Sequence, residues 1–103
     1  MIKFAYIYAM PGLDKPQFTE FKTAQAHFYA IAVNLKTPED AIDVAEQLFK
    51  QQQINMIELC GGLANANLVS QVKQVVGPKV AVGQVMYGPE YRQTLVDIIN
   101  QSQ

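Results

Sequence analysis

Residues 54–62 read INMIELCGG, a short apolar run that ends in a carboxylate, a thiol and two glycines. The run has the length and composition of a β-strand, in which successive side chains point to opposite faces. Glu58 and Cys60 therefore lie on one face, and Ile57 and Leu59 lie on the other. Because α/β proteins hold their ligands at the carboxyl ends of strands, this strand end is the expected site.

Strands and helices alternate on both sides of this run. β-Forming residues predict further strands over 1–9, 25–34 and 80–86. Capping residues and apolar spacing predict three helices, which begin at Thr37-Pro38, after Gly61-Gly62 and at Gly88-Pro89. The second helix is expected to stop at Gly77-Pro78, and the last is expected to bury a stripe of Tyr91, Leu95, Ile98 and Ile99.

The segment 13–24 is polar, and its pattern is irregular. Pro16 is suited to open a short helical turn that would hold Phe18 and Phe21 inward. The roughly 15-residue connection between the first two strands is long enough for a crossover between parallel strands. We therefore expect no strand in this segment.

The expected fold is a single small α/β domain over residues 1–103, with a four-stranded, mainly parallel sheet and three helices. Two architectures fit this order of elements. In a flavodoxin-like fold, helices cover both faces of the sheet. In half of a β/α-barrel, the sheet curves and a second subunit buries its open face.

The composition favours self-association and excludes several other partners. Half of the residues are apolar and 17% are charged, which is an apolar surplus for a chain this short. A well-filled core under a neutral polar surface is the alternative explanation. A net charge of −1 with scattered basic residues predicts no binding of nucleic acid. No apolar run is long enough to span a membrane, so no membrane partner is expected.

The N-terminus and the cysteine content point to the cytoplasm. Residues 1–4 read directly into a strand and lack the layout of a signal peptide. One cysteine cannot form an intrachain disulfide, and one cysteine with one histidine does not make a zinc site. We expect a cytoplasmic protein without a metal or another cofactor.

Glu58 is the main candidate for chemistry at the strand end. A carboxylate in a sheet covered on both faces must be hydrogen-bonded, paired or protonated. Glu58 is therefore a candidate catalytic base or ligand-binding group, or else a structural group that accepts backbone N–H bonds or pairs across an interface. Gly61 and Gly62, where the chain enters the next helix, would let backbone amides approach an anion, although a plain tight turn also explains them.

Cys60 precedes a helix start, where the helix dipole would lower the pKa of its thiol. The only histidine, His27, lies near the start of the second strand, at the opposite end of a parallel sheet. A Cys-His dyad is therefore not expected, and Cys60 is better explained as a small buried apolar residue that borders the site. Further polar residues fall at the same sheet end and complete the predicted site: Tyr8, Asn34, Gln84, Tyr87 and Arg92.

The segment Ile57–Gly62 resembles a family of short bacterial proteins, about 100 residues long, that have no assigned function. The resemblance extends to the opening strand Lys3–Tyr8, to the helix segment Ala41–Ala45 and to the strand Val82–Val85. Relatives tend to carry Phe-Gly where this chain has Leu63-Ala64. The resemblance implies the α/β fold and the position of the site, but it implies no activity.

Three functions follow from these observations. The first is a domain that binds a small polar or anionic metabolite at the carboxyl end of the sheet. The second is an isomerase or lyase in which Glu58 is the general base and the glycine amides hold an oxyanion. The third is a structural subunit of a homo-oligomeric assembly.

Overall fold

The computed structural model describes residues 1–63 and 65–101. Within these residues the strands are β1 (Ile2–Met10), β2 (Gln17–Lys22), β3 (Ala26–Asn34), β4 (Met56–Leu59) and β5 (Ala81–Gln84). The helices are α1 (Asp40–Gln52), α2 (Ala66–Val76) and α3 (Arg92–Gln101), and two 3₁₀ turns are η1 (Gly61–Leu63) and η2 (Pro89–Tyr91). The α/β class and the three helices are therefore confirmed.

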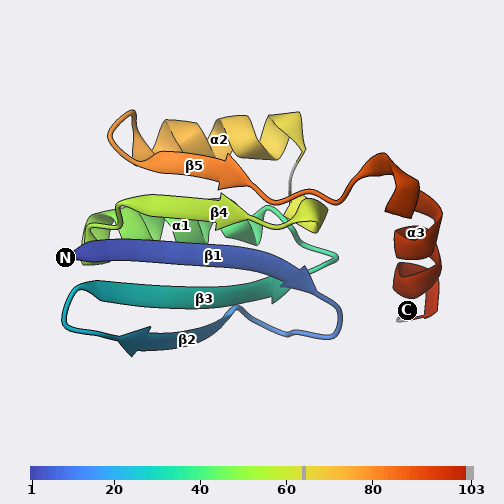
Figure 1. The fold of residues 1–103 in the computed structure, drawn as a ribbon, viewed down its shortest axis with the longest axis horizontal. Coiled ribbons are helices and arrows are strands. Elements are labelled where there is room, and N and C mark those ends of the chain that lie inside the picture. Colours follow the sequence, from blue (N-terminus) through green and yellow to red (C-terminus); the bar gives the residue numbers. More distant parts are fainter. Residues whose placement is uncertain (64, 102–103) are drawn as a thin grey trace.

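The strands form one sheet in the order β2-β3-β1-β4-β5 (Figure 1). β1 is central and pairs in parallel with β3 and β4, and β4 pairs in parallel with β5. Only β2 runs antiparallel, against β3, among the strands that the structure describes. The carboxyl ends of the parallel strands therefore meet at one edge of the sheet, as expected.

The prediction of four strands was wrong, because the segment expected to be irregular contains β2. Phe18 and Phe21 are three residues apart, which matches one side of a helical turn but places them on opposite faces of a strand. Both rings are about half exposed or more, at 48% and 64%. β2 is held mainly by its backbone pairing with the edge of β3, an interaction that sequence periodicity does not reveal.

Local sequence signals set the ends of α2. The side chain of Asn65 accepts a hydrogen bond from the N–H of Leu68 at 2.8 Å, so it caps the helix. At the other end, Gly77 has a φ of 78°, in the left-handed region that favours glycine. Its N–H donates to the carbonyl of Lys73 at 3.0 Å, which ends the helix where the sequence predicts.

Helices α1 and α2 pack against each other and against the same face of the sheet. This face contributes Ile7, Ile31, Ile57 and Leu59 to a continuous apolar core. The helices contribute Ala41, Val44, Ala45, Leu48, Leu68, Val69, Val72 and Val76. The flavodoxin-like alternative, which needs helices on both faces, was therefore wrong. Helices on one face also fit the half-barrel alternative, but the strands of a β/α-barrel follow one another in chain order, whereas here β1 lies between β3 and β4.

No described helix lies over the opposite face of the sheet (Figure 1). We call this the open face and define it by the side chains whose registers place them on it: Phe4, Tyr6, Tyr8, Phe21, Phe28, Met56 and Glu58. Its rings cover one another. Phe4 stacks on Phe28 at a centroid distance of 5.3 Å, and Tyr6 stacks on Tyr8 at 5.6 Å.

Helix α3 stands beyond the carboxyl ends of the strands instead of packing on the sheet (Figure 1). None of its ten described residues is buried. The expected buried stripe is correspondingly exposed, with Tyr91 at 53% and Ile99 at 40%. The periodicity correctly predicts an amphipathic helix, but its burial within this chain was wrong, because periodicity does not identify the surface that a helix packs on.

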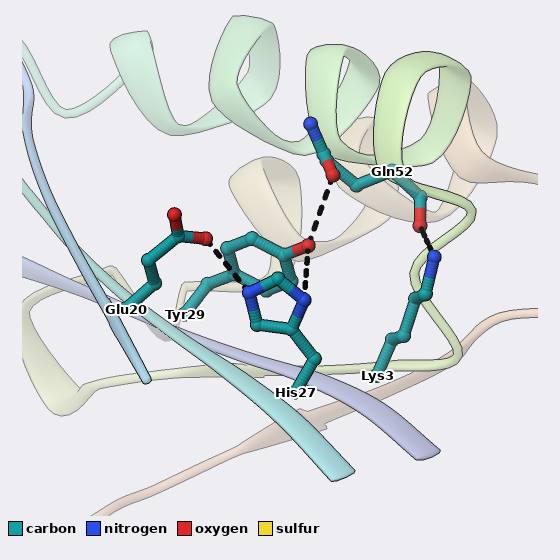
Figure 2. A network of polar contacts seen from close by, with 5 residues as sticks. All are labelled: Lys3, Glu20, His27, Tyr29 and Gln52. Carbon is teal, nitrogen blue, oxygen red and sulfur yellow. Dashed lines mark hydrogen bonds and ion pairs between the residues drawn. The ribbon is translucent and has the colours of Figure 1, made fainter. Parts of the chain in front are cut away.

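A polar network closes the opposite, amino end of the sheet (Figure 2). His27 Nε2 lies 2.7 Å from Glu20 Oε2, and His27 Nδ1 lies 3.1 Å from the hydroxyl of Tyr29. That hydroxyl donates to the side-chain oxygen of Gln52 at 3.0 Å, and Lys3 Nζ donates to the Gln52 carbonyl at 2.8 Å. The network joins the exposed strand β2 to β3, β1 and the end of α1.

We expect the Glu20→Ala variant to lower the free energy of unfolding by about 1 kcal/mol, because buried His27 loses its partner. The effect is small because the carboxylate is 59% exposed and screened by solvent. Lys22→Ala is the matched control on the same strand and the same side of it, since Lys22 has no side-chain partner in the described residues. Urea unfolding measures both, and equal effects of the two variants would contradict a structural role for the network.

Burial raises the pKa of Tyr29 above its ordinary value of 10.0, and the Glu20 carboxylate adds to the rise. A phenol whose pKa is higher in the folded state stabilises the fold fully below the unfolded-state pKa and loses this contribution as pH rises further. We therefore expect Tyr29→Phe to be less stable than the wild type near neutral pH by about 1 to 2 kcal/mol. The difference in unfolding free energy between the wild type and the variant should shrink above pH 10.0 in denaturant titrations. A difference that stays constant with pH would contradict a raised pKa of Tyr29 in the folded state.

Candidate functional site

A cleft of about 450 Å³ lies at the carboxyl edge of the sheet, between the strand ends and α3. Its floor comes from β1 and from the turn after β4, one wall comes from the segment that follows β5, and the other comes from α3. The lining residues are Tyr6, Tyr8, Cys60, Gly62, Val85, Met86, Tyr87, Leu95 and Ile99. The cleft therefore lies at the sheet edge where the sequence predicts a site.

Four of the predicted site residues line this cleft, namely Tyr8, Cys60, Gly62 and Tyr87. Tyr8 is partly buried near the end of β1, and its ring stacks on Tyr6. Tyr87 follows β5 and is 64% exposed. The structure therefore brings together side chains from three segments that are distant in the sequence.

Cys60 forms hydrogen bonds with the backbone of β1 in addition to lining the cleft. Its Sγ accepts a hydrogen bond from the N–H of Ala9 at 3.4 Å, and its own N–H donates to the carbonyl of Ile7 at 3.0 Å. Partly buried, it packs against the core. His27 lies at the other end of the sheet, in register with Lys3, so the predicted separation of Cys60 and His27 at opposite ends of the sheet is confirmed.

The two glycines occupy a different position from the one expected. Gly61 and Gly62 form the separate 3₁₀ turn η1, whereas α2 begins later, after the cap at Asn65. Ala64, between the turn and the helix, lies outside the described residues. The glycine amides are therefore not the first amides of α2, so their expected place at the start of that helix was wrong, while their role in binding a ligand stays a prediction. A Cβ atom on Gly62 would lie 3.5 Å from the Cβ of Ala9, an ordinary contact.

Glu58 is partly buried on the open face, next to the cleft rather than in its lining. It lies opposite Tyr6 on β1 and opposite Gly83 on β5. A Cβ atom on Gly83 would lie 3.8 Å from Glu58 Cγ, an ordinary contact. In the described residues this carboxylate has neither an ion pair nor a side-chain hydrogen bond.

Three other predicted residues lie at the same edge of the sheet but do not line the cleft. Asn34 is used by the loops, since its Nδ2 donates to the carbonyl of Leu13 and its Oδ1 accepts from the N–H of Lys36 at 2.9 Å. Gln84 ends β5 with an exposed side chain, and Arg92 begins α3 with an exposed side chain. The structure therefore does not unite the whole predicted set.

Five lining residues were missed by sequence reasoning: Tyr6, Val85, Met86, Leu95 and Ile99. The sequence contained a signal for Tyr6, because Tyr6 and Tyr8 are two residues apart and therefore lie on the same face of β1. Leu95 and Ile99 were assigned to a buried helix stripe, so they were expected in the core instead. That the cleft includes α3 could not be predicted from local patterns.

The cleft lining has tyrosine hydroxyls and a thiol but no basic side chain. Burial raises the pKa of Tyr6 above its ordinary value of 10.0, and neighbouring Cys60, Tyr87, Glu58 and Tyr8 add to the rise. The Tyr6 phenol is therefore protonated at neutral pH and can donate a hydrogen bond. In the described part of the chain, no cluster of three or more His, Cys, Asp or Glu residues could hold a metal ion.

The chain was compared with known proteins. It matches a family described as a family of unknown function (DUF6506), over residues 2–100. The comparison with curated proteins gave no match. No helix in residues 1–63 and 65–101 is long and apolar enough to cross a membrane. That the motif Ile57–Gly62 marks this family stays a prediction. The match spans nearly the whole chain, which therefore belongs to the family of unknown function DUF6506.

Proposed function

We propose that this protein binds a small molecule in the cleft between the carboxyl edge of the sheet and α3. The observation that carries the proposal is the coincidence of a cleft of about 450 Å³ with Tyr8, Cys60, Gly62 and Tyr87. Its volume lies in the range of ligand pockets in proteins, which are mostly apolar and contain a few placed polar groups. The edge is also where parallel α/β sheets hold their ligands.

The lining chemistry indicates a neutral ligand with a flat apolar body and polar groups at its margin. The side chains of Val85, Met86 and Leu95 offer apolar contact, and the tyrosine rings offer surfaces for stacking. The phenol hydroxyls supply hydrogen bonds, whereas the nearest acid, Glu58, repels anions. Of the two expected classes, polar and anionic, we therefore propose the polar one.

The enzyme alternative, with Glu58 as general base, stays a prediction. A general base must reach the proton that it abstracts, directly or through one water molecule. Glu58 adjoins the cleft through its neighbour Tyr6 but is not among the lining residues. Binding requires no such reach, so the geometry favours a binding domain over an isomerase or lyase.

Filling the cleft should weaken binding. We expect uncharged aromatic fragments to bind the wild type in ligand-observed NMR, and we expect Leu95→Trp to weaken their affinity by roughly tenfold or more, because indole occupies the space. Thr94→Trp is the matched control, since Thr94 is exposed on the same helix and does not line the cleft. Fragments that bind both variants equally would contradict the proposed site, and a preference for carboxylate fragments would contradict the neutral class.

Removing the Tyr8 hydroxyl tests whether it forms a hydrogen bond with ligands in the cleft. We expect Tyr8→Phe to weaken the best hydrogen-bonding fragment by about fivefold to tenfold, as expected for one lost neutral hydrogen bond. The ring and its stacking on Tyr6 are retained in this variant, so purely apolar fragments should bind unchanged. Isothermal titration calorimetry measures both classes, and an equal loss for both would contradict a hydrogen-bonding role for Tyr8.

A further inference from the structure

The open face of the sheet is largely apolar, although no described helix covers it. Phe4, Phe28 and Phe21 form a continuous row of rings across three strands, with Phe28 between the other two. Phe21 is 64% exposed, and Ile2, at the start of the same face, is 54% exposed. A contiguous exposed apolar patch of this kind marks an interaction surface.

The open face also carries little charge. Among the described strand residues, Glu58 is its one charged side chain, and it has no ion pair there. Two copies of such a face can therefore meet with little electrostatic repulsion. Arg92, exposed at the start of α3, supplies a cation that has no side-chain partner in the described part of the chain.

Helix α3 has the form of an arm. Residues 85–88, which form neither helix nor strand, and the 3₁₀ turn η2 connect it to β5, and the helix stands off the end of the sheet (Figure 1). Val96 is 44% exposed and does not line the cleft, so the helix has apolar surface that its own chain does not use. The arm gives the molecule its long axis, with extents of 39 × 24 × 23 Å.

The area that the chain exposes in excess of a compact monomer matches what each partner of a stable dimer buries. The chain exposes 6743 Å² of surface. A compact monomer of 11.5 kDa is expected to expose about 5,800 Å². The excess of roughly 900 Å² matches the share that each partner buries in a protein–protein interface of standard size, about 800 Å².

We propose that the open face is covered by a second copy of this chain, placed face to face about a two-fold axis, with α3 of each copy packed against the other. A two-fold interface uses the same patch on both subunits, which suits one uniform, nearly uncharged apolar face. The inference does not depend on the cleft holding a ligand.

Matched variants on β2 test the face. Phe21 and Phe18 are exposed on the same strand, but only Phe21 lies on the open face. Size-exclusion chromatography with light scattering should give the wild type twice the 11.5 kDa mass of the chain. We expect Phe21→Glu to raise the dissociation constant of the dimer by roughly tenfold or more, and Phe18→Glu to leave it nearly unchanged.

A second pair tests the arm. We expect Val96→Asp to weaken the dimer, whereas Thr94→Asp, at an exposed polar position of the same helix, should not. Both substituted side chains are exposed in the chain, so circular dichroism should show folded variants. A wild type that is monomeric up to high micromolar concentration would overturn the proposal. Equal effects of Phe21→Glu and Phe18→Glu, or of the two α3 variants, would overturn it as well.

Discussion

Two helices cover one face of the sheet, and the described residues provide no third layer for the other. The core between sheet, α1 and α2 is closed and well filled, with Ile7, Ile31 and Leu59 fully buried. The aromatic rings on the open face can only stack on their neighbours within the sheet. The exposed apolar area follows from this one-sided burial, and the cleft lies beside it, between the arm α3 and the edge of the sheet.

The proposed cleft and the proposed dimer are compatible. Tyr6 and Tyr8 belong both to the open face and to the cleft lining, so the cleft opens onto the face that a second copy would cover. In a dimer it would become an enclosed pocket, where hydrogen bonds to tyrosine hydroxyls are stronger because water is excluded. Ligand affinity and dimer stability would then be linked, since a ligand held by both copies stabilises their association.

Local signals in the sequence predicted those parts of the fold that local chemistry determines. The alternating apolar residues of β1 and β3, the buried stripe of α1 and the stop at Gly77 appear where they were expected. β2 was missed because Phe18 and Phe21 are spaced like a helical turn and because backbone pairing holds this strand at the edge. The position of α3 could not be predicted, because its apolar stripe shows that it must pack on something without showing on what. The same holds for the site. The expectation that ligands bind at the carboxyl ends of parallel strands predicted Tyr8 and Tyr87. Leu95 and Ile99 line the cleft only because α3 lies beside the sheet edge.

The proposed role of the open face is that of an interface between two copies of the chain. Isotope-filtered NOE spectra of a mixture of labelled and unlabelled protein test it most directly, because they report only contacts between different copies. We expect intermolecular NOEs from the rings of Phe4, Phe21 and Phe28 to a second copy, including its α3. Ring protons that show NOEs only within their own chain, whether to its own α3 or to neighbouring strands, would contradict it.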